Sequence, residues 1–80
     1  MIEISLEEFE KLVHDDFRKS NRCLEDEDIE RYLKTDEAKK VIRDAYNSDI
    51  KKYKSGELTY KVFTIGCVSS VAYCLTYMYE

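Results

Sequence analysis

His14 is the only histidine in the chain and its one candidate for general acid–base catalysis. It stands next to Asp15 and Asp16, beside the apolar stripe of a predicted helix. A general base needs a positioned partner, and a side chain one residue further along a helix points away from it. The sequence therefore predicts a flanking surface histidine, and we expect that the protein is not an enzyme.

The three cysteines and the single histidine match a Cys₃His zinc site by number but not by spacing. Cys67 and Cys74 lie two turns apart on one predicted helix, about 10 Å, whereas zinc thiolates must be near neighbours. The same separation excludes a disulfide between them, so both are predicted to be small apolar core residues. Cys23, beside Arg22, is the one thiol that we expect to react. No metal and no cofactor are expected.

Two acidic features invite other chemistry. The acidic run at 25–28 lacks the central glycine of an EF-hand loop, so it is predicted to be a solvated helix start. Asp49 falls within an apolar helical stripe, between Ala45 and Tyr53, where a buried carboxylate needs a partner. We expect a tyrosine hydroxyl, a basic side chain or a helix N-terminus; alternatively, the segment 47–49 breaks the helix and exposes the carboxylate.

A row of basic residues on the predicted helix at 36–55 could bind nucleic acid. Rows of Lys and Arg contact phosphates, and an Asn side chain can read a base edge. Against this stand the acidic balance of the chain, Asp44 within the same face, and the absence of a helix-turn-helix spacing. Nucleic-acid binding is therefore the alternative hypothesis, carried by Lys40, Arg43, Asn47, Lys51 and Lys54.

Local signals predict the helices that position these residues. Ser5 and Glu8 form a capping box, flanked by a hydrophobic staple of Ile4 and Phe9, so a helix should begin at Leu6 and fade near 20–21. The pattern then predicts a short helix at 26–34, a longer one at 36–55 and a last one from residue 60.

Residues between the later helices also predict where these helices begin and end. Thr35 or Asp36 can cap the third helix, and Gly56 is expected to end it in the left-handed conformation. Thr59 can cap the last helix, with Leu58 and Phe63 as a second staple. The predicted fold is an all-α, compact bundle of three main helices and one short helix, with the C-terminal helix central, forming a single domain over residues 1–80.

The last helix carries eighteen consecutive uncharged residues, from Val62 to Tyr79. At 100° per residue its predicted core face consists of Tyr60, Phe63, Cys67, Val71, Cys74, Leu75 and Met78. The opposite face also lacks charge, unlike an ordinary solvated helix face. It contains Val62, Gly66, Ser69, Ser70, Tyr73, Thr76 and Tyr77.

Three explanations of this second face stay open. The other helices can wrap both sides of the last helix. Alternatively the face binds another protein, where Gly66 and Ser70 permit close approach and Tyr73 and Tyr77 supply contact area. A membrane-spanning helix is disfavoured, because several Ser, Thr and Tyr residues dilute the hydrophobicity and no basic residue follows.

The amino-acid composition limits the possible fold classes and functions. Two Gly and no Pro among 80 residues argue against an all-β fold and phosphate-cradling loops. The net charge of −4 conceals an acidic first half and a basic second half, which can support antiparallel self-association. The odd cysteine count and the lack of a secretory signal favour the cytoplasm. The sequence thus predicts a small interaction or regulatory protein that forms a homodimer or binds a protein partner through Val62, Gly66, Ser69, Ser70, Tyr73 and Tyr77.

Overall fold

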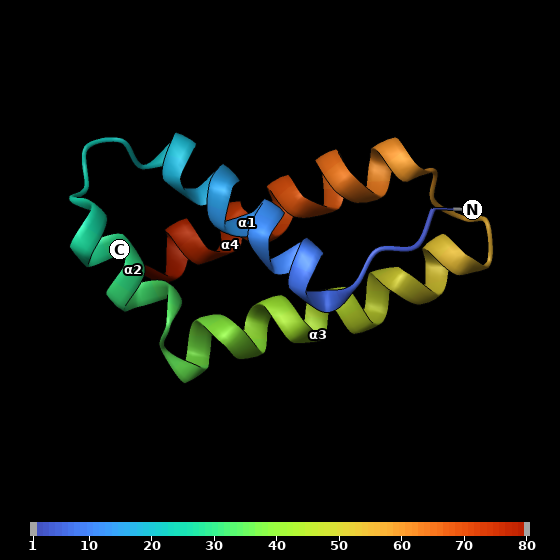
Figure 1. The fold of residues 1–80 in the computed structure, drawn as a ribbon, viewed down its shortest axis with the longest axis horizontal. Helices are drawn as coiled ribbons and strands as arrows, with labels where there is room; N and C mark the ends of the chain where they lie inside the picture. Colours follow the sequence, from blue (N-terminus) through green and yellow to red (C-terminus); the bar gives the residue numbers. More distant parts are fainter. Residues whose placement is uncertain (1, 80) are drawn as a thin grey trace.

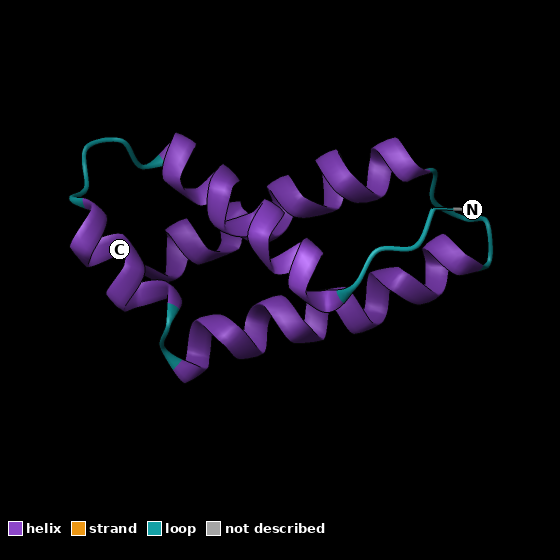
Figure 2. Cartoon of the chain, viewed as in Figure 1, coloured by secondary structure: helices purple, strands orange, loops and turns teal. Residues whose placement is uncertain are grey.

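Helices form all the regular secondary structure of residues 2–79, the part of the chain that this computed structural model describes. They are α1 (Leu6–Ser20), α2 (Asp26–Leu33), α3 (Asp36–Lys54), the π-helical stretch η1 (Val62–Cys67) and α4 (Val68–Tyr79). Residues 60 and 61 are also helical, so η1 and α4 belong to one continuous helix. The predicted all-α bundle is confirmed, and short loops join its helices (Figure 2).

The C-terminal helix contacts the other three, as predicted. It packs most extensively against α1, which crosses it, and also against α3, which runs along the lower edge of the view in Figure 1. Tyr32 of α2 reaches its far end, where the hydroxyl donates a 2.8 Å hydrogen bond to the Leu75 carbonyl. The resulting body measures 38 × 21 × 18 Å.

The predicted start of α1 is confirmed, with one change in the capping hydrogen bonds. The Glu8 backbone N–H donates to Ser5 Oγ at 3.1 Å. The Glu8 carboxylate accepts from the Ser5 hydroxyl at 3.2 Å, whereas a full capping box would use the Ser5 backbone N–H. Ile4 and Phe9 are both buried, as the staple requires.

The reversal between α3 and η1 depends on Gly56, the one residue of the described chain with a positive φ, at 88°. The Glu57 N–H donates to the Lys52 carbonyl at 2.9 Å, and the Gly56 N–H donates to the Tyr53 carbonyl at 3.1 Å. This pair of bonds is a Schellman motif, which needs the left-handed conformation that glycine adopts without strain. Thr59 then caps the next helix through the Val62 N–H.

Phe63 lies at the centre of the core. Its ring stacks on Phe9 at 5.4 Å and on Tyr53 at 5.0 Å between centroids, and it is fully buried. Because the three rings come from η1, α1 and α3, this cluster joins the three long helices. The other buried apolar residues are Ile4, Val13, Phe17, Ile29, Leu33, Ala38, Ile42, Val68, Val71, Ala72 and Leu75.

The π-helical turn changes the predicted core face of the last helix. An α-helical period places Phe63, Cys67 and Val71 in line, but a π turn holds an extra residue, and the buried sequence becomes Phe63, Val68 and Val71. Cys67 is only half-buried. The predictions that Tyr60, Cys74 and Met78 belong to the core are wrong, since all three are exposed, and Val68 and Ala72 take their place.

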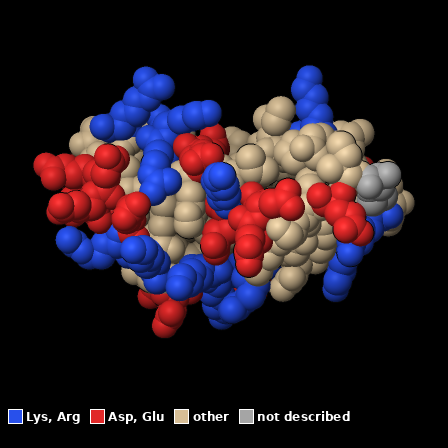
Figure 3. Space-filling view, viewed as in Figure 1, with Lys and Arg blue, Asp and Glu red and all other residues tan. Residues whose placement is uncertain are grey.

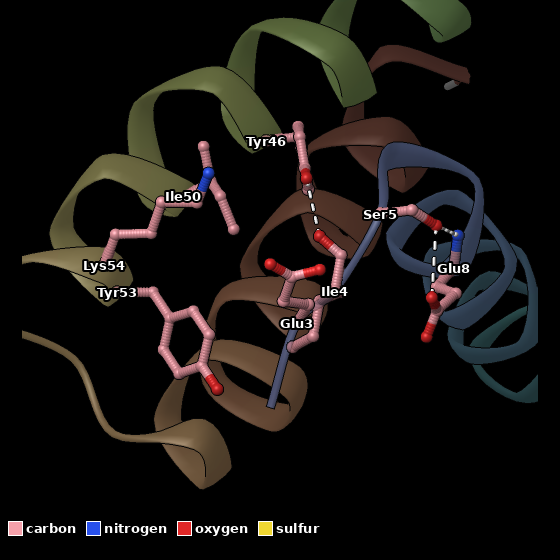
Figure 4. A pocket seen from close by; sticks show the side chains of 8 residues that line it. All are labelled: Glu3, Ile4, Ser5, Glu8, Tyr46, Ile50, Tyr53 and Lys54. Carbon is pink, nitrogen blue, oxygen red and sulfur yellow. Dashed lines mark hydrogen bonds between the residues drawn. The ribbon is translucent and has the colours of Figure 1, made fainter. Parts of the chain in front are cut away.

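Residues 2–5 form an extended strap along α3. The Tyr46 hydroxyl donates to the Ile4 carbonyl and the Tyr53 hydroxyl donates to the Ile2 carbonyl, each at 2.6 Å. Figure 4 shows the first of these bonds, with the strap passing between α3 and the start of α1. Two tyrosines of one helix thus hold the backbone at Ile2 and Ile4.

Candidate interaction surface

The outer side of the helix formed by η1 and α4 is an exposed surface without charge, which we call the uncharged face. Its two largest side chains, Tyr73 and Tyr77, are 69% and 73% exposed, and Ile65 is 60% exposed. All of its members are exposed in the described structure. They are Val62, Ile65, Gly66, Ser69, Ser70, Tyr73, Cys74 and Tyr77.

This exposure decides one of the three alternatives left open by the sequence. The other helices cover only the side of α4 that carries Val71 and Leu75, so the idea that they wrap both sides is wrong for the described chain. All six predicted interface residues do share the exposed face. The π turn adds Ile65, and the exposure of Cys74 adds a second residue that the helical period had assigned elsewhere.

Thr76 does not belong to the face. It is half-buried, and its Oγ1 accepts a 3.0 Å hydrogen bond from the Asn21 side chain, which also donates to the Phe17 carbonyl at 2.9 Å. The Thr76 hydroxyl in turn donates to the Ala72 carbonyl. This network ties the end of α1 to α4.

A shallow depression lies in the middle of the face. Gly66 forms its floor, where a Cβ atom would meet only Val62 Cγ1 at 3.7 Å, an ordinary contact distance. The space above Gly66 is therefore open, and a neighbouring side chain can approach the backbone there. The depression is lined by Ile65, Gly66, Ser69, Ser70, Tyr73 and Cys74.

Opposite charges flank the two ends of the uncharged face. Near its start, residues 51–61 contain four lysines and one glutamate. Near its end lies α2, whose Tyr32 packs on Tyr79 with ring centroids 5.0 Å apart. Residues 25–30, at the beginning of α2, contain five acidic side chains and no basic one. Figure 3 shows this acidic group at the left end of the molecule and uncharged surface at the upper right, where η1 lies.

Length and composition alone would let Val62–Tyr79 cross a membrane, with a mean hydropathy of 1.4. A helix that packs in the core of a soluble bundle passes the same test, and 28% of this segment is buried against the rest of the chain. Its inner side carries Phe63 and Leu75, which the bundle already covers completely. The apolar content is therefore divided between a core side and the uncharged face.

The predicted nucleic-acid stripe is exposed along the length of α3. Lys40, Arg43, Asn47, Lys51 and Lys54 all face solvent. The ion pairs of residues 2–79 are Arg18–Glu30 and Arg31–Asp28, so the stripe's cations make none there. Lys and Arg gather along the lower edge of Figure 3, over α3, and acidic side chains interrupt them.

The prediction that His14 is a surface residue needs correction. It is half-buried, and its Nε2 is a buried atom without a hydrogen-bond partner in the described structure. Desolvation by burial lowers its pKa below the usual 6.5; Glu10 opposes the shift, Arg18 adds to it and Asp15 opposes it. The imidazole lies in a small cavity with Arg18, Glu30, Leu33 and Lys34, between α1 and α2.

The folding stability should therefore decrease when the pH is lowered and His14 takes up a proton. The unfolded chain binds this proton near pH 6.5, and the folded chain binds it only at lower pH. The contribution of the neutral imidazole is thus fully present above pH 6.5 and declines as the pH falls below it. Urea unfolding at pH 7.5 and pH 5.5 should show a smaller pH difference for His14→Phe than for the unchanged protein. If the two proteins lost equal stability between pH 7.5 and pH 5.5, protonation of His14 would not be the cause of the loss.

The surroundings of Asp49 differ from those that the sequence predicted. It is half-buried on an unbroken α3, so the alternative of a broken helix is wrong, and the nearby group is the Cys67 thiol of η1, not a tyrosine, a basic side chain or a helix N-terminus. The pKa of Cys67 is raised to about 11, mainly by burial and further by the negative charge of Asp49, while Lys52 opposes the shift. Cys67 therefore stays protonated, while Cys23 and Cys74 are exposed.

A pocket of about 460 Å³ lies between the strap and α3, and Figure 4 shows its lining. Glu3, Glu8 and Lys54 stand at its rim. Burial raises the pKa of Tyr46, with smaller contributions from Glu8 and Glu3. Because the Tyr46 hydroxyl already donates to the Ile4 carbonyl, this pocket presents no polar group that requires a ligand.

Neither metal chemistry nor a known relative supplies a function. Within residues 2–79, no three His, Cys, Asp or Glu side chains come together where they could hold a metal ion. No protein-family model, no curated protein and no solved structure matches this chain. Its function must therefore be inferred from the uncharged face and its surroundings.

Proposed function

We propose that this protein acts by binding another protein chain through the uncharged face, without catalysing a reaction. The observation that carries the proposal is the exposure of Tyr73, Tyr77 and Ile65 on one helix side that has no charged residue. Tyrosine is enriched at protein interfaces, where charged residues are depleted from the centre. The basic and acidic groups at the two ends of the face supply the polar surroundings of such an interface.

The packing of the helix supports this assignment. Val71, Ala72 and Leu75 already hold α4 to the bundle, so the uncharged face is not needed for the fold. Tyr73 and Tyr77 lie one turn apart, with ring centroids 6.3 Å from each other, and form a continuous aromatic ridge. We place the protein in the cytoplasm, where its three free thiols would stay reduced.

The test compares tagged chains expressed in the native host. Tyr73→Glu should abolish co-purification of the bound chain, because burying an unpaired carboxylate at an interface is costly. The fold should persist, because this side chain is 69% exposed. Circular dichroism checks the fold, and Lys40→Glu on the exposed side of α3 is the matched control. A bound chain retained equally by all three proteins would refute the use of this face.

Nucleic-acid binding is the second candidate, favoured by one observation: the cations of the α3 stripe are exposed and make no ion pairs within residues 2–79. The triple variant Lys40→Glu/Arg43→Glu/Lys51→Glu separates the two candidates. Salt-dependent binding of duplex DNA or RNA that this variant loses, and that Tyr73→Glu retains, would establish the stripe as the binding surface.

A further inference from the structure

We propose that the chain bound at the uncharged face is a second copy of this protein, packed antiparallel across a twofold axis that passes between Ser69 and Ser70. This inference rests on the proposed function, since it names the partner for the same face. It follows from three properties of the surface: the spacing of its residues, its shape and the charges at its ends.

The spacing is self-complementary. A twofold interface requires that, when residue i contacts residue j of the partner, residue j contacts residue i. In an antiparallel helix pair, a residue on one side of the twofold axis therefore meets the residue of the partner that lies equally far from the axis on the other side. About the midpoint of Ser69 and Ser70, the eight members of the face map onto one another, as the pairs Val62–Tyr77, Ile65–Cys74, Gly66–Tyr73 and Ser69–Ser70.

The shape agrees with this pairing. The largest central side chain, Tyr73, meets the residue without a side chain, Gly66, above which the space is open. The tyrosine ring of each copy would fill the depression of the other, and Ser69 and Ser70 would let the backbones approach at the axis. In a parallel pair without offset, Tyr73 would meet Tyr73 and each Gly66 would face a gap.

The charges favour the same orientation. The lysine-rich segment 51–61 lies at the start of the face and the acidic segment 25–30 lies at its end. Antiparallel packing brings the basic end of each copy to the acidic end of the other, so both ends attract. Parallel packing would place like charges together at both ends.

The size of the face sets the expected affinity. From Val62 to Tyr77 the helix is about 24 Å long at 1.5 Å per residue. One helix side of this length buries less than the roughly 800 Å² per partner of a standard interface. We therefore expect a dimer with a dissociation constant in the micromolar range, weakened at least fivefold when the salt concentration is raised tenfold.

Disulfide cross-linking tests the register directly. In a Cys23→Ser background, Ile65→Cys places a thiol opposite the native Cys74 of the other copy, and mild oxidation should produce a covalent dimer. The two cysteines of one chain are nine residues apart, about 13 Å, and cannot join each other. The matched control, Ile65→Cys/Cys74→Ser, should form no covalent dimer, because two residues 65 are also about 13 Å apart across the axis.

Each other outcome overturns the inference in a distinct way. Efficient cross-linking of the control, or of the native Cys74 to itself, would show a parallel pair. A strict monomer in sedimentation up to high micromolar concentration would exclude the second copy, while the proposed function would survive if a host protein were still lost with Tyr73→Glu. Flotation of the purified protein with phosphatidylcholine vesicles, abolished by Tyr73→Glu, would make a lipid surface the occupant and refute both.

Discussion

Phe63→Ala should remove a large part of the free energy that keeps the protein folded. Removing a fully buried phenylalanine costs about 3–5 kcal/mol, through lost burial and the cavity that remains. A chain of this size has a total stability of about 4–12 kcal/mol. We expect a loss of about 5 kcal/mol, the upper end of the cost of such a substitution. The reason is that the ring stacks on both Phe9 and Tyr53, so one truncation weakens contacts among three helices.

The measurement is urea unfolding followed by circular dichroism, at a protein concentration low enough to avoid self-association. Val62→Ala is the matched control, since it truncates the neighbouring residue of η1 on the exposed side and should change stability by less than about 0.5 kcal/mol. Similar losses for the two variants would mean that the aromatic cluster does not hold the bundle together.

Gly66→Tyr should weaken self-association by roughly 100-fold without destabilising the folded monomer. The new ring would occupy the space that the partner's tyrosine fills, and the twofold axis repeats this clash at a second place. The monomer should be unaffected or slightly more stable, because a Cβ at this position has room and glycine is a poor helix former. Sedimentation equilibrium measures the first effect and urea unfolding the second.

A compensating substitution makes this prediction specific to the register. Tyr73→Ala alone should also weaken the dimer, because it leaves the depression empty. The double variant Gly66→Tyr/Tyr73→Ala exchanges the large and small partners, and it should recover affinity to within about tenfold of the unchanged protein. If the double variant associates no better than Gly66→Tyr, residues 66 and 73 do not meet across the axis.

The helices could be predicted from the sequence because their ends depend on local chemistry. Ser5, Thr35 and Thr59 cap through hydrogen bonds to backbone groups three residues away, and Gly56 ends α3 through its own φ. Such signals are contained in a few consecutive residues. The all-α bundle followed from these signals together with the apolar stripes.

The errors arose where packing overrides local pattern. A fixed helical period assigned Cys74 and Met78 to the core, and the π turn shifted the buried side so that Val68 and Ala72 are buried instead. No local residue type marks that turn in advance. The burial of His14 and the closeness of Asp49 to Cys67 likewise depend on neighbours from other helices.

The candidate surface was predicted almost completely, because the lack of charge is visible in the sequence itself. All six expected residues are exposed together, and only Ile65 and Cys74 had to be added. Whether the other helices would cover that side could not be decided from the stripes alone. The answer depended on how α1 and α3 cross α4, which is a property of the assembled bundle.

The π turn of η1 amounts to an α-helix with one inserted residue. Because such an insertion rotates everything that follows by about 100° relative to what precedes it, Phe63 can point into the aromatic cluster while Val68 and Leu75 continue the contact with α1. A regular α-helix at 100° per residue would also place Val62, Gly66, Tyr73 and Tyr77 on one side, so the extra residue is not what brings them together. The inserted residue instead changes the core side, where Val68 and Ala72 are buried and Cys74 is exposed.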